Sequence, residues 1–88
     1  MAIFMVDVKN RWALITGASR GIGYLTAKFM ASKGCNLVLH SRTMEHSERV
    51  AAEVREMGVK AYAVCAELSD LDAVKKMLAD IDALGIRI

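Results

Sequence analysis

The sequence predicts an α/β protein, the first half of a doubly wound parallel sheet with the order β-α-β-α-β-α. Short apolar runs suited to buried parallel strands alternate with longer stretches whose apolar residues recur at helical spacing. Each longer stretch has the length of a right-handed crossover between two parallel strands. The stretch TGASRGIG at residues 16–23 stands between the first strand and the first helix, and its glycines suit a sharp turn. We therefore assign residues 1–88 to one partial domain, which ends before a fourth strand.

The first strand is expected at about residues 11–16, where Trp12-Ala13-Leu14-Ile15 is apolar on both faces. A helix is expected from about residue 21 to residue 33, and Gly34 is placed to end it in a left-handed conformation. One face of this helix is expected to carry the apolar residues at i, i+3, i+7 and i+8, which are Ile22, Leu25, Phe29 and Met30.

The second strand is expected at residues 36–40. Thr43 is expected to cap the helix that follows, and Gly58 to end it. One side of this helix carries the apolar residues Val50, Ala51, Val54 and Met57.

The third strand is expected at residues 60–65, and Ser69 is expected to cap the third helix. Asp70 and Asp72 would lie in its first turn, where the helix dipole favours acids. The helix runs out near Leu84, and its buried stripe is expected to consist of Leu71, Val74, Leu78 and Ile81.

The composition describes a globular chain, with 55% hydrophobic and 25% charged residues. A net charge of +2 is too small to indicate a nucleic acid or a membrane surface as partner. The apolar run Ala2-Ile3-Phe4-Met5-Val6 is shorter than a signal-peptide core of about 7–15 residues, and no stretch approaches the roughly 20 apolar residues of a membrane span. We expect a cytoplasmic protein in which Cys35 and Cys65 are free thiols rather than a disulfide or a ligand pair.

The glycine-rich turn is the strongest indication of function. Gly17, Gly21 and Gly23 lie where the backbone must turn and then start a helix. The first helical turn offers unpaired N–H groups and a positive dipole end to an anion. With the preceding Trp12-Ala13-Leu14-Ile15-Thr16, the spacing Gly-x-x-x-Gly-x-Gly resembles the short-chain dehydrogenase/reductase family.

The resemblance extends over nearly the whole chain, from Val8-Lys9-Asn10-Arg11 through Leu68-Ser69-Asp70 and into the helix beyond. It implies a Rossmann fold that binds a dinucleotide cofactor. The chain is less than half as long as is typical of that family, so the resemblance implies only the N-terminal, cofactor-binding half.

The resemblance also implies the residues of the cofactor site. Ser19, Arg20 and Ile22 would join the turn glycines around the cofactor phosphates and the nearby ribose. Ser41 falls where members that prefer NAD usually carry an acid, and Arg42 follows it. Arg20 and Arg42 would converge on the 2′-phosphate, so NADP(H) is expected to be favoured over NAD(H). The alternative for Arg42 is an ordinary exposed arginine at a strand end.

Glu67-Leu68 occupies the place where the family usually has an aspartate followed by an aliphatic residue. That pair holds the edge of the adenine. Glutamate is one methylene longer than aspartate, so we expect the contact of Glu67 with the exocyclic amine to be looser.

No catalytic residue and no metal site is assigned within this chain. Tyr24 and Lys28 have the Tyr-x-x-x-Lys spacing of the family's catalytic pair, but Tyr24 directly follows the phosphate turn and lacks a serine from a later strand. We interpret this match as a coincidence, and the true catalytic serine, tyrosine and lysine would lie downstream. His40 and His46 lack companions at metal-ligand spacing and are expected to be structural or solvated.

Two classes of function follow. The first is the cofactor-binding portion of an oxidoreductase that would transfer hydride between NADP(H) and a carbonyl or alcohol substrate, inactive by itself. The second is a non-catalytic nucleotide-binding or homo-oligomeric assembly module. A chain that ends before the fourth strand leaves its first strand as a sheet edge, and such an edge recruits another strand. We therefore expect either a homo-oligomer that pairs the first strands of two copies or a missing C-terminal half.

Overall fold

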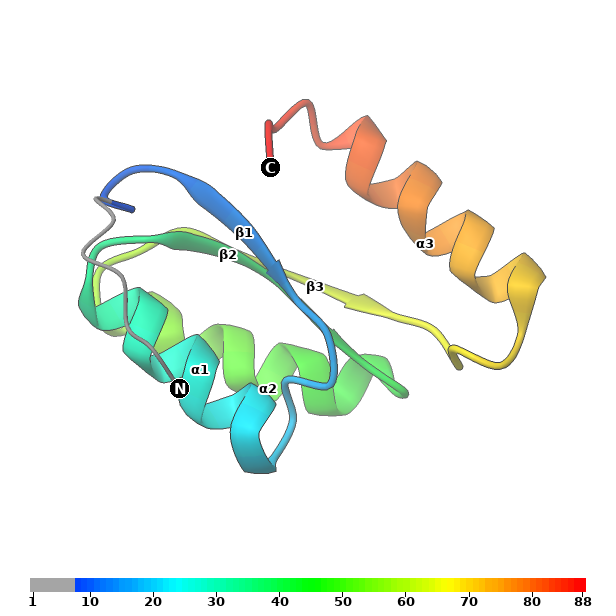
Figure 1. The fold of residues 1–88 in the computed structure, drawn as a ribbon, viewed down its shortest axis with the longest axis horizontal. Coiled ribbons are helices and arrows are strands. Elements are labelled where there is room, and N and C mark those ends of the chain that lie inside the picture. The colour runs from blue at the N-terminus through cyan, green and yellow to red at the C-terminus, as the bar shows by residue number, and fades with distance from the viewer. Residues whose placement is uncertain (1–7) are drawn as a thin grey trace.

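The computed structural model describes residues 8–88, which form a three-stranded parallel sheet with helices on both faces (Figure 1). The apolar run at residues 2–6 lies outside the described residues. The chain forms β1 (Trp12–Ile15), α1 (Gly21–Ser32), β2 (Asn36–Ser41), α2 (Met44–Arg55), β3 (Ala61–Cys65) and α3 (Leu71–Ala83). This order confirms the predicted fold class, and the element bounds differ from the expected ones by only one or two residues.

β2 is the centre of the sheet because it pairs in parallel with both other strands. Its register sets Leu37 beside Ala13 of β1 and beside Ala61 of β3. The carboxyl ends of the three strands therefore lie along one edge, where the segments 16–20, 42–43 and 66–70 leave the sheet. Ligands of open parallel sheets bind outside this edge, so the register brings the candidate site residues together.

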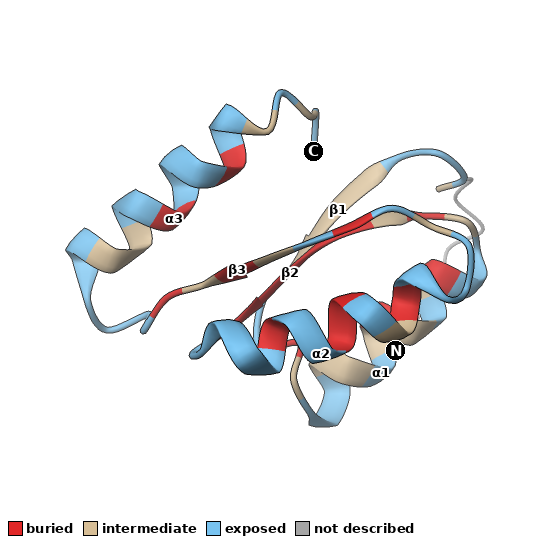
Figure 2. Ribbon diagram, turned by 180° about the vertical axis from the view of Figure 1, so that it is seen from behind, coloured by how far each residue is buried: buried red, intermediate tan, exposed pale blue. Residues whose placement is uncertain are grey.

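The side chains of β2 alternate between two apolar layers. Leu37 and Leu39 pack on the side of α1 and α2, in a cluster that includes Val50. Val38 packs on the opposite side, in a cluster that includes Met77 of α3. Leu37, Val38 and Leu39 are fully buried, which stabilises the fold by about 1.5–3 kcal/mol for each of them. Figure 2 shows most of β2 in the colour of buried residues.

The helix caps agree with the sequence at one helix and differ at another. Thr43 caps α2 as expected, because its hydroxyl oxygen accepts the His46 N–H at 3.4 Å. The expected cap of α3 at Ser69 is wrong by one residue. Asp70 is the cap, and its Oδ1 accepts the Ala73 N–H at 3.2 Å. Both residue types are good caps, and an aspartate there also places a negative charge at the positive end of the helix.

The apolar face expected on α1 is wrong for three of its four residues, which are exposed: Ile22, Leu25 and Phe29. Ile22 is 80% exposed and Leu25 is 65% exposed, whereas Met30 is half-buried against the core. The helix instead packs through Ala27 and Ala31, both buried. Small alanines let the helix lie close to the sheet, and a pattern weighted by large apolar side chains passes over them.

The stripe expected on α3 is correct only in part. Ile81 is buried and Val74 is half-buried, but Leu71 and Leu78 are exposed. Met77, which was not expected in the stripe, is buried instead. The helix contacts the sheet along a narrower line than the periodicity indicated. On α2, Val50, Ala51 and Val54 are buried as expected, whereas Met57 follows the end of the helix and is exposed.

An aromatic pair joins the two outer strands on the α3 side of the sheet. The rings of Trp12 on β1 and Tyr62 on β3 stack with their centroids 5.5 Å apart and an interplanar angle of 15°. Trp12 is half-buried beside Val38. The stack therefore spans the width of the sheet over β2. Within residues 8–88, every helix is too short or too polar to cross a bilayer.

The two free cysteines differ in their surroundings, which predicts different reactivity. Cys35 is buried, with Sγ 3.4 Å from the carbonyl oxygens of Arg11 and Asn36, and burial raises the pKa of its thiol. Cys65 is half-buried. Because the thiolate is the reactive form, we expect iodoacetamide to modify Cys65 about tenfold faster than Cys35 at neutral pH. Peptide mapping by mass spectrometry measures both rates, and equal rates would contradict the burial of Cys35.

Candidate cofactor-binding site

The glycine-rich turn follows β1 and leads directly into α1. Gly17 and Gly21 have φ angles of 61° and 64°, which are left-handed conformations that favour glycine. Gly23 is required for a different reason, since a Cβ there would overlap the carbonyl oxygen of Gly17. Arg20 is the cap residue of α1 but makes no side-chain cap hydrogen bond, and the first turn carries no acid. The N-terminus of α1 therefore presents its N–H groups and its positive dipole end without a competing side chain.

His40 at the end of β2 holds this turn in place. The Gly17 N–H donates to His40 Nδ1 at 3.0 Å, and the Ala18 N–H donates to the His40 carbonyl oxygen at 2.8 Å. The other ring nitrogen, Nε2, lies 2.9 Å from the carbonyl oxygen of Ala66. His40 is thus structural rather than solvated, one of the two alternatives left open by the sequence.

One small cleft brings together seven of the ten residues proposed from the sequence. With His40, its lining consists of Gly17, Ser19, Arg20, Ser41, Arg42, Glu67 and Leu68, around a volume of about 280 Å³. Gly21, Ile22 and Gly23 are not part of this lining, because they form the first turn of α1. They stand at the helix end that would face a phosphate.

A second cleft of about 520 Å³ adjoins the first and shares Ser19, Arg20, Arg42 and Glu67 with it. Its remaining lining residues come from α2 and its cap, and the sequence reading did not assign them to the site: Thr43, His46 and Arg49. A signal for these residues was present in the sequence, because a spacing of three residues places Thr43, His46 and Arg49 on one side of the helix. Arg49 contacts the glycine turn directly, because its Nη2 donates to the Ser19 carbonyl oxygen at 2.8 Å.

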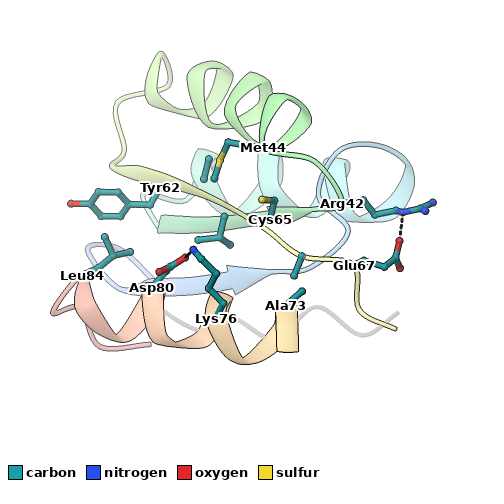
Figure 3. A pocket seen from close by; sticks show the side chains of 12 residues that line it. Arg42, Met44, Tyr62, Cys65, Glu67, Ala73, Lys76, Asp80 and Leu84 are labelled. Carbon is teal, nitrogen blue, oxygen red and sulfur yellow. Dashed lines mark hydrogen bonds and ion pairs between the residues drawn. The ribbon is translucent and has the colours of Figure 1, made fainter. Parts of the chain in front are cut away.

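Arg42 and Glu67, which the sequence reading gave separate roles, form an ion pair. The Nε of Arg42 lies 2.7 Å from Oε2 of Glu67 (Figure 3). The two side chains are 78% and 46% exposed, so the pair contributes only about 0–1 kcal/mol. A guanidinium has five N–H donors, and this bond uses the one on Nε. Arg42 can therefore turn to an anionic ligand at small cost.

The cleft drawn in Figure 3 lies between β3 and α3 and has a volume of about 480 Å³. Arg42 and Glu67 are the residues it shares with the other two clefts. Lys76 and Asp80 line the cleft from α3 and form an ion pair at 3.2 Å.

The hydroxyl of Ser41 belongs to a buried polar network. Ser41 Oγ lies 2.7 Å from the Thr43 carbonyl oxygen and 2.6 Å from Ser47 Oγ, and Ser47 Oγ lies 2.6 Å from the Val64 carbonyl oxygen. This network ties β2, α2 and β3 together below the cleft. Ser41 thus leaves this position of the cleft without a carboxylate.

A family model described as short chain dehydrogenase matches residues 11–86. The chain belongs to the short-chain dehydrogenase family. A fatty acyl-CoA reductase of Acinetobacter baylyi is 39% identical over 82 residues, which cover 93% of this chain and 28% of that protein. The glycine turn and the strand order of the chain are therefore those of a recognised dinucleotide-binding family.

Solved structures of short-chain dehydrogenases also superpose on most of this chain. A metagenomic short-chain oxidoreductase in complex with NADP aligns with a TM-score of 0.79 at 32% identity, over 90% of this chain and 36% of its own. A short-chain dehydrogenase from Sphingobium yanoikuyae in complex with NADPH aligns with a TM-score of 0.71 at 37% identity. This alignment covers 75% of this chain and 26% of the Sphingobium chain. The chain spans between 26% and 36% of the length of these relatives.

The Tyr-x-x-x-Lys match in α1 has structural contacts. The Tyr24 hydroxyl donates to Oε1 of Glu53 on α2 at 3.1 Å, and the ring packs against the core between α1 and α2. The Lys28 ammonium lies 5.9 Å from the centroid of the same ring. Tyr24 therefore joins α1 to α2. Among residues 8–88, no group of three or more histidine, cysteine, aspartate or glutamate side chains is arranged to hold a metal ion.

The two kinds of glycine in the turn predict different costs of substitution. Gly21→Ala forces a left-handed φ on alanine in open space, which costs about 1–2 kcal/mol. Gly23→Ala inserts a methyl group against the Gly17 carbonyl oxygen and displaces the turn, so its cost should exceed that of Gly21→Ala. Urea unfolding of both variants measures the difference, and a Gly23→Ala protein as stable as Gly21→Ala would contradict the close approach.

Proposed function

We propose that this chain is the cofactor-binding part of a short-chain oxidoreductase that transfers hydride between NADP(H) and a carbonyl or alcohol substrate. In this proposal residues 1–88 have little or no activity alone, because the catalytic serine, tyrosine and lysine of the family would lie downstream. We also propose a cytoplasmic location, which the two free cysteines support.

The preference for NADP(H) is supported by the charge of the second cleft. Three guanidinium groups, from Arg20, Arg42 and Arg49, line it with a single carboxylate, that of Glu67. A 2′-phosphate is dianionic, and arginine binds phosphate through paired, charge-assisted hydrogen bonds. A carboxylate at position 41 would favour the free ribose hydroxyls of NAD(H), and this chain has Ser41 there.

The proposal gives each candidate residue a role. The phosphates and the nearby ribose are surrounded by residues of the glycine-rich turn and the start of α1: Gly17, Ser19, Gly21, Ile22 and Gly23. Arg20 and Arg42 bind the 2′-phosphate, while Arg49 fixes the Ser19 carbonyl oxygen and so the turn. Leu68 and Glu67 border the adenine, and Glu67 also pairs with Arg42.

Calorimetric titration with NADPH and NADH tests the cofactor preference. We expect NADPH to bind more tightly, and Arg42→Ala to reduce its affinity about 10- to 100-fold, the loss of one charge-assisted contact of about 1.5–3 kcal/mol. NADH should be affected much less, because it lacks the 2′-phosphate. Arg87→Ala removes the same charge from the C-terminal segment after α3 and should leave both affinities unchanged. Equal binding of the two dinucleotides would contradict the preference.

A second candidate, a homo-oligomeric assembly module, is supported by an open sheet edge. Within the described residues, β1 pairs only with β2, and α1 next to it exposes Ile22, Leu25 and Phe29. Two copies that paired their β1 strands antiparallel about a twofold axis would form a six-stranded sheet. Absence of dinucleotide binding by the folded chain would favour this candidate.

Light scattering coupled to size-exclusion chromatography tests the assembly candidate. We expect a dimer whose β1 amides exchange slowly with solvent, because β1 of the other copy pairs with the free edge of β1. Leu25→Lys should weaken a dimer that covers α1, whereas Lys75→Ala on α3 is a control far from β1 in the sheet order. A stable, folded monomer would count against pairing through β1.

A further inference from the structure

His40 is the most deeply buried ionisable group at the cleft, and both of its ring nitrogens are engaged. Its residue is 2% exposed. Nδ1 lies 3.0 Å from the Gly17 nitrogen, and Nε2 lies 2.9 Å from the Ala66 carbonyl oxygen. The predicted cofactor contacts do not include His40, so its place between these two groups requires its own explanation.

The partners of the ring select a single protonation state. A backbone N–H can only donate, so Nδ1 facing Gly17 must carry a lone pair. A carbonyl oxygen can only accept, so Nε2 facing Ala66 must carry the proton. Both bonds are satisfied only by the neutral Nε2–H tautomer. A second proton on Nδ1 would set an N–H against the N–H of Gly17, and that bond would be lost.

The two backbone groups that His40 joins belong to different segments at the small cleft of about 280 Å³. Gly17 starts the phosphate turn, and the backbone of Ala18 is bound to the His40 carbonyl oxygen as well. Ala66 directly precedes Glu67 and Leu68, which line the other side. The imidazole therefore sets the separation of the turn from the segment that follows β3.

Charged side chains from three elements line the cleft beside His40. Arg20 comes from the glycine turn, Arg42 from the end of β2, and Glu67 from the segment after β3, and all three line the same cleft as His40. Glu67 is paired with Arg42, so two guanidinium groups and one carboxylate surround the cleft.

We propose that His40 is a positioning residue for the dinucleotide, whose neutral Nε2–H tautomer fixes the phosphate turn and whose protonation releases it. Dinucleotide binding is then lost as the pH falls, because only the uncharged ring accepts the Gly17 N–H. The inference rests on the proposed function for its effect on the cofactor. The tautomer and the Gly17 contact can be tested without any cofactor.

The first experiment measures the ring by nitrogen NMR in the chain with His46→Asn, which leaves His40 as the single histidine. We expect a protonated Nε2 and an unprotonated Nδ1 at about pH 8, with slow exchange of the Gly17 amide. On acidification toward about pH 5, the Gly17 amide resonance should move together with the ring resonances. An Nδ1–H tautomer, or a Gly17 amide that ignores the titration of the ring, would overturn the inference.

The second experiment measures binding of NADH and NADPH between about pH 8 and pH 5.5. His40→Asn places an amide oxygen near the position of Nδ1 and can still accept the Gly17 N–H, but it does not titrate. His40→Gln reaches toward Ala66 and leaves Gly17 without its acceptor. We expect the wild-type chain to lose affinity for both dinucleotides about tenfold or more on acidification. The decisive profile is that of NADH, because the 2′-phosphate of NADPH itself takes up a proton at about pH 6. For NADH, His40→Asn should retain binding with a flat profile, and His40→Gln should bind weakly at every pH.

The controls separate this inference from the proposed function. His46→Asn removes the exposed histidine of the second cleft, and the acid loss of NADH binding should persist in it. An acid loss that disappears with His46→Asn, or that persists in His40→Asn, would overturn the role of His40. A chain that binds neither dinucleotide at any pH would count against the proposed function and against the effect on binding, while the NMR experiment would still decide the tautomer and the Gly17 contact.

Discussion

The parallel pairing of β2 with a neighbour on each side is the constraint on which the rest of the structure depends. It aligns the ends of three strands, so that loops distant in the sequence meet outside one edge of the sheet. It also buries every residue of β2 after Asn36, and a polar side chain at the end of such a strand must find its hydrogen bonds inside the protein. His40 and Ser41 do so, the first with the glycine turn and Ala66, the second with the α2 cap and Ser47.

The sequence was sufficient for features set by local chemistry. Strand runs, turn glycines and the Thr43 cap depend on residue type and spacing, and the structure confirms them. Seven of the proposed site residues line one cleft. The motifs that indicated them fall after the carboxyl ends of parallel strands, and these ends meet at one edge of the sheet. The packed faces of α1 and α3 were less predictable, because the choice between Ala27 and Leu25 depends on how closely the helix approaches the sheet.

Side-chain contacts between residues distant in the sequence could not be predicted from hydrophobic periodicity. The contact of Arg49 with the Ser19 carbonyl oxygen joins positions thirty residues apart, and nothing near either residue in the sequence indicates it. The link from His40 to Gly17 is of the same kind. The pairing of Arg42 with Glu67 is a further example, since the sequence motifs give these two residues separate roles and do not indicate their contact.

The three arginines of the second cleft differ in how far they are already engaged. Arg49 is bound to a backbone carbonyl oxygen and Arg42 to a carboxylate, both by solvent-exposed hydrogen bonds, and Arg20 stands at the helix start without a side-chain cap bond. Arg49 is thus the one of these three arginines that the structure shows bound to the backbone of the glycine-rich turn. Under the proposed function, such an arrangement would order the turn before binding and leave the final geometry of the phosphate contacts to the ligand.

The stacked rings of Trp12 and Tyr62 give the chain an intrinsic optical probe. Trp12 is the single tryptophan, so indole fluorescence has one source, and that source is on β1. Its stacking partner is on β3, so the emission depends on β2 keeping the outer strands at a fixed separation. The emission spectrum of the unlabelled protein therefore reports the integrity of the whole sheet.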